Sequence, residues 1–428
     1  MIFNKFSQTA NDFASTYLSR TLAYGFSVIL SILISRLLGP FVKGQLAVIA
    51  LIGSVCVLVG NLGLGSFNMY LVSKDKSKAE KLYINSFWIS LVMSLIALVA
   101  IFLLVTFFPS FLNNIPPKHL LIYLVSLPFL FLYQIILPLL AGEQKFKLYN
   151  FVIVCYSFLN LVFISLLFFF HFSNLKYLIA AYSLTNIIIG ILTLILAKPS
   201  KIENLKFEKN LFREALDYGL RIYLATIFST LVLKADLYMV NFFRGPAEAG
   251  LYSLVSSFGD VFFLLPYSLA FIILPKITPL ADKDKVSSVA KYFAITFYLS
   301  LILALGALLL IKPVVKLLFG PVFLPSAETI IVLLPGLICW ALVSILGQYF
   351  AATKYNVKII IGWFLVFLLN IILNYLYIPQ FGIKAAAVTS DIAYFFILIF
   401  LFILFKRETK TSLGVILKLP MDVLFQRR

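Results

Sequence analysis

Charged residues are scarce in this chain of 428 residues. Only 12% of its residues are Asp, Glu, Lys or Arg, whereas 62% are hydrophobic. A soluble protein of this length needs a polar surface, and these charged residues are too few to cover one. No polar stretch is long enough for a separate soluble domain. Lipid is therefore the expected solvent, because apolar runs of about 20 residues, the length that crosses a bilayer, recur along the whole sequence.

Residues with reactive side chains are also few. The three cysteines, Cys56, Cys155 and Cys339, lie inside apolar runs without metal-ligand spacing, and the two histidines stand alone. No P-loop, HExxH pattern or nucleophile–base set is present. We therefore expect no metal, no cofactor and no energising ATPase, and the sequence does not predict an enzyme. The alternative of a membrane enzyme of envelope glycan assembly stays open.

The formal net charge is +18. In a soluble protein this excess would suggest nucleic acid, but here the basic residues lie in short loops between apolar runs. They predict contact with anionic membrane lipids and no nucleic-acid partner. The first apolar run contains Arg20 and Arg36, and no small-residue cleavage site follows it, so we expect no cleavable signal peptide. Residues 2–13 have the apolar spacing of an amphipathic helix that precedes the first span.

The sequence predicts an all-α protein with about twelve transmembrane helices. Turn residues such as Gly39-Pro40, Gly245-Pro246, Gly320-Pro321 and Pro379 separate the apolar segments. The predicted spans are 17–38, 45–72, 83–108, 119–141, 149–171, 177–197, 215–243, 250–275, 289–311, 325–351, 359–378 and 385–405.

The loop charges predict the orientation. With the N-terminus in the cytoplasm, 24 of the 35 Lys and Arg residues lie in cytoplasmic segments. Only seven lie outside: Lys43, Lys118, Lys176, Arg244, Lys312, Lys316 and Lys384. The other four lie within spans. This positive-inside bias predicts a bacterial inner (plasma) membrane protein with both termini in the cytoplasm.

Short motifs repeat at an offset of about half the chain. Gly39-Pro40 with Gly44 matches Gly245-Pro246 with Gly250, Leu127-Pro128 matches Leu334-Pro335, and Asn160 matches Asn370. Six spans per half make the repeat parallel, which predicts two bundles around a central cavity and alternating access. The expected parts are an N-terminal six-helix bundle (1–197), a cytoplasmic linker (198–214), a C-terminal six-helix bundle (215–405) and a basic cytoplasmic tail (406–428). Since one chain supplies both halves, a monomer is the expected functional form.

The order of these motifs resembles a known family. The resemblance rests on these motifs: Ser35-Arg36-Leu37-Leu38-Gly39-Pro40, Gly60-Asn61-Leu62-Gly63-Leu64-Gly65, Asp236, Gly250-Leu251-Tyr252, Leu265-Pro266, Leu274-Pro275 and Ala351-Ala352-Thr353-Lys354-Tyr355. Over residues 15–405 the chain resembles the polysaccharide repeat-unit (O-antigen or capsule) flippases of the multidrug/oligosaccharidyl-lipid/polysaccharide exporter superfamily. The resemblance implies transfer of an undecaprenyl-diphosphate-type lipid-linked oligosaccharide, as in lipopolysaccharide biosynthesis, to the outer leaflet. A polysaccharide polymerase is a candidate partner.

Ionisable residues within the spans are the candidate site residues, because a charge near the bilayer centre is costly and usually faces a cavity or a partner. The hairpin around residue 246 places Asp260 level with Lys234, and predicts either a substrate-binding pair or a structural salt bridge. Lys234 and Asp236 are two residues apart and point to different faces of their helix.

Arginines suit a diphosphate because the guanidinium binds two oxygens at once. Arg221, four residues after Asp217, and Arg20 are predicted to bind substrate near the cytoplasmic side, and Arg36 near the outer side. A simple interfacial or paired role is the alternative for each. Asn186 is a candidate for bonding sugar hydroxyls, with an interhelical hydrogen bond as its alternative.

Asp236, Asp260 and Asp391 are the candidates for ion coupling, and helix packing is the alternative for Asp391. A cation-coupled multidrug exporter of the same superfamily is the competing function, in which one of these carboxylates exchanges protons or sodium for a cationic drug.

Overall fold

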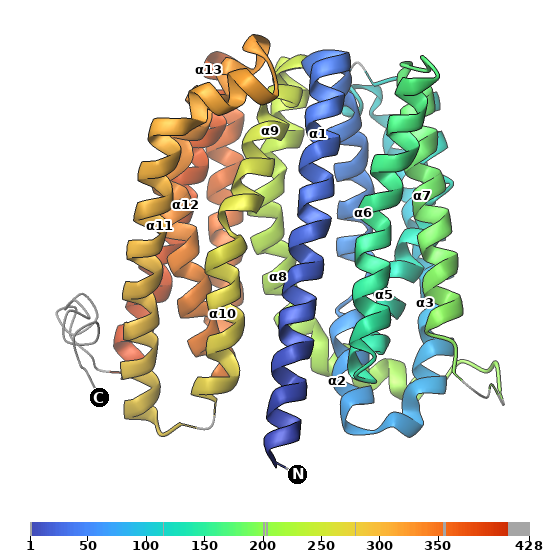
Figure 1. Ribbon diagram of the computed structural model, residues 1–428, viewed down its shortest axis with the longest axis vertical. Helices are drawn as coiled ribbons and strands as arrows, with labels where there is room; N and C mark the ends of the chain where they lie inside the picture. The colour runs from blue at the N-terminus through green and yellow to red at the C-terminus, as the bar shows by residue number, and fades with distance from the viewer. Residues whose placement is uncertain are drawn as a thin grey trace. The chain divides into compact units, whose positions relative to one another are not determined.

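The computed structural model describes residues 2–113, 115–199, 202, 204–278, 280–353 and 357–409, without the side chains of residues 2–14, 218–222, 271, 275, 282 and 283. These residues form thirteen α-helices and no β-strand (Figure 1). The helices are α1 (Ile2–Gly60), α2 (Leu64–Lys74), α3 (Ala79–Phe107), α4 (Pro117–Leu124), α5 (Leu127–Gly142), α6 (Phe146–Phe169), α7 (Leu175–Leu196), α8 (Lys209–Arg244), α9 (Pro246–Phe262), α10 (Leu264–Ile277), α11 (Asp282–Leu318), α12 (Leu324–Ala352) and α13 (Val357–Thr409).

Nine of the described helical segments are long and apolar enough to cross a membrane, or ten if the bent pair α4 and α5 is one span. The first and the last of these, Ser15–Gly60 and Val357–Thr409, contain 46 and 53 residues. Each exceeds twice the roughly 20 residues of one crossing, and each contains a glycine with non-helical backbone. A multi-span all-helical membrane protein is thus confirmed, whereas the count of twelve crossings stays a prediction.

The chain divides into two compact units, Met1–Tyr223 and Leu224–Arg428. The chain passes from one unit to the other within α8, after the linker 198–214 expected from the sequence. In the first unit α5 packs against α2, α3 and α7, and in the second α12 packs against α9, α10, α11 and α13. Each is the most central helix of its unit, with side chains such as Phe131 and Ile345 almost or fully buried. The repeated Leu-Pro pair lies in these two helices.

The repeated Gly-Pro motif adopts one backbone conformation at both of its positions. Gly39 has φ 70° and ψ −174°, and Gly245 has φ 86° and ψ 176°. Only glycine readily adopts this region, and the proline that follows suits the first turn of the next helix because it needs no amide hydrogen there. Both motifs therefore reverse the chain tightly, as the predicted repeat requires.

Three segments that the sequence predicts as continuous spans are broken in the structure. The segment 45–72 breaks between α1 and α2, where Gly63 has φ 78° and the Asn61 side chain accepts a hydrogen bond from the Gly65 amide. The segment 119–141 bends by 41° between α4 and α5. The segment 250–275 breaks at Phe263, since Pro266 has no amide hydrogen to donate to the preceding turn.

In the second unit the break expected at Pro379 lies three residues later. Gly382 has φ 59° and ψ −141°, and Pro379 remains inside α13. A Cβ atom on Gly382 would come within 2.4 Å of a Glu248 carboxylate oxygen. The backbone conformation therefore favours glycine at this kink, whereas the Glu248 carboxylate, at the end of a flexible side chain, could move aside for a Cβ atom.

Residues 204–208 of the linker dock on α3 within the first unit. The Asn85 side chain donates to the Glu208 carbonyl at 3.0 Å and accepts from the Glu208 amide at 2.8 Å. Trp88 Nε1 donates to the Leu205 carbonyl at 3.0 Å, and Lys81 forms a 3.1 Å ion pair with the Glu208 side chain. These contacts fix the end of the linker to the first unit.

Replacing Asn85 with alanine is expected to release this segment from α3. The Glu208 amide loses its bond to Asn85 and the Glu208 carbonyl keeps only the Phe212 amide, and each lost bond costs about 0.5–1.5 kcal/mol. The measurement is the rate of tryptic cleavage after Lys206 in detergent, which should rise severalfold. Ser94→Ala is the matched control, because Ser94 is buried on the same helix but bonds only to its own turn. An Asn85→Ala protein cleaved at the unchanged rate would contradict the docking.

Candidate functional site

An ion pair joins α8 and α9 midway along the hairpin of the second unit. Lys234 Nζ lies 3.0 Å from Asp260 Oδ2 and 3.2 Å from Oδ1, and 3.4 Å from the Ser256 hydroxyl. The pairing predicted from the hairpin register is confirmed. Their side chains remain 29% and 44% exposed, so the pair is accessible to a ligand. Because a charged pair inside a span avoids lipid, this exposed surface is expected to face water or a cavity.

A second cluster surrounds Asp236, which is completely buried on the opposite side of α8. One carboxylate oxygen accepts from Asn374 at 2.6 Å. The other accepts from the Tyr252 hydroxyl at 3.0 Å and from Ser390. The donors come from α9 and from both parts of α13, so Asp236 connects three helices of the unit.

The three donors to Asp236 are neutral side chains. A buried carboxylate with several hydrogen-bond donors is partly stabilised, but its charge is not balanced by amide and hydroxyl groups alone. Among the described residues, no Lys or Arg forms a salt bridge with Asp236. Asp236 therefore differs from Asp260, which has Lys234 as its counter-ion, and ion coupling stays a prediction for both carboxylates.

Two other predicted site residues lie within helix contacts. Asp391 accepts a hydrogen bond from the Gly336 amide of α12 at 2.9 Å, which is the packing role weighed as its alternative. Asn186 is 1% exposed, donates to Ser126 at 3.0 Å and accepts from Tyr156 at 3.2 Å. Asn186 therefore makes the interhelical hydrogen bonds that were its alternative, and its contact with the substrate stays a prediction.

The structure describes the side chains of two of the three predicted substrate-binding arginines, Arg20 and Arg36. Arg20 is exposed and donates to the Tyr149 hydroxyl at 3.4 Å, close to the start of α6. Arg36 is also exposed, three residues before the Gly39 turn. Arg221 belongs to α8, but its side chain lies outside the described residues. Arg20 thus has the accessibility that an anion-binding residue needs.

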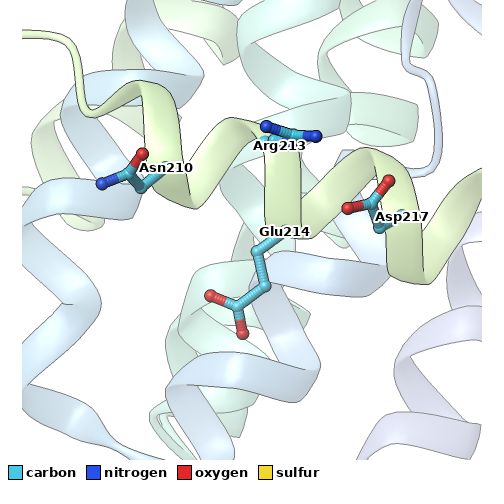
Figure 2. Close-up of a pocket in the computed structure, with 4 residues that line it drawn as sticks. All are labelled: Asn210, Arg213, Glu214 and Asp217. Carbon is cyan, nitrogen blue, oxygen red and sulfur yellow. The ribbon is translucent and has the colours of Figure 1, made fainter.

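An open pocket of 580 Å³ lies along the first turns of α8, lined by Asn210, Arg213, Glu214 and Asp217. Figure 2 shows that the Glu214 side chain points away from those of Arg213 and Asp217. Two carboxylates against one guanidinium give these residues a net negative charge. The pocket is therefore a poor receptor for a phosphate group, and its polar surface is typical of a helix end in contact with water.

Lys43 was predicted to lie in an outer loop, as one of the seven basic residues on the outer side of the membrane. In the structure it is 7% exposed, and its ammonium group donates to Ser31 at 2.9 Å and Ser35 at 2.8 Å. The Gly39 turn folds the two parts of α1 against each other and brings these residues together. Ser31 and Ser35 lie four residues apart on one helix face, and this spacing could have predicted a paired hydroxyl site for the Lys43 ammonium group.

Comparisons with known proteins place this fold. Residues 9–262 match the family model described as polysaccharide biosynthesis protein. No curated protein matches the sequence. The solved structure of lipid II flippase MurJ in an inward closed conformation is 18% identical, with a TM-score of 0.75 over 96% of this chain and 90% of that one.

Multidrug transporters share the same fold. An inward-facing multidrug resistance MATE family transporter of the MOP superfamily is 11% identical, with a TM-score of 0.73 over 90% of this chain and 94% of that chain. A MOP superfamily transporter from Pyrococcus furiosus, whose binding pocket is described as reversed in polarity, is 13% identical, with a TM-score of 0.66 over 94% and 95% of the two chains. The chain therefore has the fold common to these flippases and transporters.

Proposed function

The chain belongs to the polysaccharide biosynthesis protein family, and on that basis we propose that it is a flippase for a polyprenyl-diphosphate-linked oligosaccharide. It moves this lipid from the cytoplasmic to the outer leaflet of a bacterial inner membrane by alternating access of its two units. The observation that carries the proposal is the partly exposed Lys234–Asp260 pair inside the spans. The fold shared with a lipid II flippase supports it.

The Lys234–Asp260 pair is suited to exchange partners with a diphosphate. Asp260 holds the amine in place and neutralises it when no substrate is bound. A diphosphate carries more negative charge than one carboxylate and competes for the same ammonium hydrogens. Arg20, Arg221 and Arg36 add cations at other depths along the path. The polyprenyl tail stays in lipid, since burying it in protein would gain nothing.

We assign ion coupling to Asp236 rather than to Asp260 or Asp391. Its carboxylate, on α8, lies among donors from α9 and α13, so gain or loss of a proton or sodium ion changes the contacts that hold these three helices together. That linkage is what alternating access needs from a coupling site. The loop-charge bias supports a cytoplasmic location for both termini. The presence of both units in one chain supports function as a monomer, and a polysaccharide polymerase is the proposed partner.

The proposed function is tested by the leaflet that holds the lipid-linked oligosaccharide. Cells without this chain should accumulate complete repeat units on the cytoplasmic leaflet, where a membrane-impermeant oxidant such as periodate does not reach them. Supplying the unchanged chain should return them to the outer leaflet. Truncated units would point instead to a missing glycan enzyme, and an unchanged outer-leaflet fraction would contradict the flippase.

Replacing both Arg20 and Arg221 with alanine is expected to reduce export about tenfold, because each guanidinium contributes a charge-assisted hydrogen bond to the diphosphate. Export is measured as surface polysaccharide at matched protein level. Lysines at both positions should retain part of the activity, since the charge is kept and the two-pronged geometry is lost. Undiminished polysaccharide in the alanine variant would remove the role assigned to these arginines.

A cation-coupled multidrug exporter is the second candidate, favoured by the buried Asp236 cluster and by the fold shared with the MATE transporters. In that case Asp260 would bind a cationic drug, and Asp260→Asn would raise the accumulation of ethidium in cells. A flippase with the Lys234 role proposed here should leave ethidium accumulation unchanged in that variant.

A further inference from the structure

An aromatic cluster in the second unit surrounds Trp340 of α12. The Trp340 ring lies 4.9 Å from that of Tyr394, 5.3 Å from Trp363 and 6.3 Å from Phe263, measured between ring centroids. Trp340 itself is 5% exposed. Packing on three sides fixes the orientation of the indole and therefore the direction of its N–H group.

The indole N–H points at Tyr267 of α10. Trp340 Nε1 donates to the Tyr267 hydroxyl oxygen at 2.7 Å, and the Tyr267 ring also contacts Phe263, with centroids 5.4 Å apart. Tyr267 is nevertheless 43% exposed. Its ring is held at both ends while much of its surface remains open, so a ligand would lose little side-chain entropy by packing against it.

Tyr267 is expected on the same side of α9–α10 as the Lys234–Asp260 pair, because residues seven apart share a helix face and helical backbone bonds, from the Phe263 amide to Gly259 and from the Tyr267 amide to Phe263, continue across the break. It follows Asp260 by seven residues, which is two helical turns and about 10 Å along the axis. The ion pair is expected to face a polar space rather than lipid, and the exposed part of the Tyr267 ring is then expected to face the same space. The distance from a diphosphate to the first sugars attached to it is of this order.

We propose that Tyr267, positioned by Trp340, is a sugar-stacking residue of the substrate path. The faces of a pyranose ring carry C–H groups with partial positive charge, and these attract the negative face of an aromatic ring. This inference rests on the proposed function. Lys234 then holds the charged end of the substrate, and Tyr267 supplies the contact that distinguishes a sugar-bearing lipid from the bare carrier.

The test compares two probes that differ only in the sugar, undecaprenyl diphosphate and undecaprenyl-diphosphate N-acetylglucosamine. Binding to purified full-length protein in detergent is measured by native mass spectrometry. Tyr267→Leu should weaken the sugar-bearing probe about three- to tenfold and leave the sugar-free probe unchanged. Tyr267→Phe keeps the ring but loses the hydroxyl that accepts from Trp340, so its sugar preference should lie between those of the unchanged protein and Tyr267→Leu.

Two further variants isolate the role of position. Trp340→Phe keeps an aromatic ring but lacks the donor to Tyr267, so the sugar-dependent difference should fall while sugar-free binding stays. Tyr377→Leu is the matched control, since Tyr377 is 46% exposed on α13 of the same unit. It should leave both probes unchanged, whereas an equal effect at Tyr377 would reveal a general loss of tyrosine–lipid contacts.

The outcomes separate the stacking role from the proposed function. If the unchanged protein binds the sugar-free probe but Tyr267→Leu weakens both probes equally or neither, the stacking role is wrong and the flippase proposal stands. If the unchanged protein binds neither probe, both are overturned. Melting temperatures within about 2 °C of the unchanged protein show that the variants are folded.

Discussion

Replacing Asp236 with alanine is expected to abolish export and to destabilise the second unit. The substitution leaves Asn374, Tyr252 and Ser390 without their common acceptor in a buried site. An unsatisfied buried donor costs about 1–3 kcal/mol, so a loss of at least 2–3 kcal/mol is expected, or about 5–10 °C in melting temperature. The measurement is thermal unfolding in detergent alongside export of the lipid-linked oligosaccharide.

Asp236→Asn separates the two roles of this side chain. An asparagine keeps an acceptor for Asn374, and the hydroxyls of Tyr252 and Ser390 can rotate to accept from its amide. We therefore expect nearly unchanged melting but loss of transport, because the neutral amide cannot take up a proton and binds sodium weakly. Full transport by Asp236→Asn under proton and sodium gradients would show that Asp236 has only a structural role.

The Asp236 cluster shows what the sequence could and could not predict. Hydropathy identified Asp236 as an unusual charge within a span, and that prediction needed only local sequence. Its partners Asn374 and Ser390 are 138 and 154 residues away. Which residues of α13 face α8 depends on how that helix is rotated about its axis, and the kink at Gly382 changes the rotation. Apolar periodicity does not fix it, because α13 is apolar on most sides.

The Lys234–Asp260 pair was predictable for the opposite reason. A tight turn at Gly245-Pro246 sets the register of the two helices that follow and precede it, so residues at similar distances from the turn lie level. Lys43 has the same kind of constraint, since it and its partner Ser35 lie four residues on either side of Gly39. Asn186 has no such turn nearby. A polar residue in a span satisfies its hydrogen bonds either with a substrate or with a neighbouring helix, and for Asn186 only the packing of α7 against its neighbours decides between them.

Neutralising the Lys234–Asp260 pair is expected to keep the fold and lose export. Replacing a buried or half-buried ion pair with neutral residues of similar volume is often neutral or stabilising, whereas removing one partner leaves an unpaired charge. Lys234→Met with Asp260→Asn should therefore melt near the unchanged protein. Lys234→Met alone leaves the Asp260 carboxylate unpaired and should melt lower.

Export distinguishes a substrate-binding amine from a structural salt bridge. If Lys234 binds the diphosphate, the double variant should export about tenfold to a hundredfold less, the equivalent of one or two charge-assisted hydrogen bonds. Asp260→Asn alone should export at or near the normal rate, because the amine is kept and its competitor is removed. If the pair only holds α8 to α9, the double variant should regain the export that Lys234→Met loses. Recovery of export together with stability would therefore overturn the role of Lys234, whereas recovery of stability alone supports it.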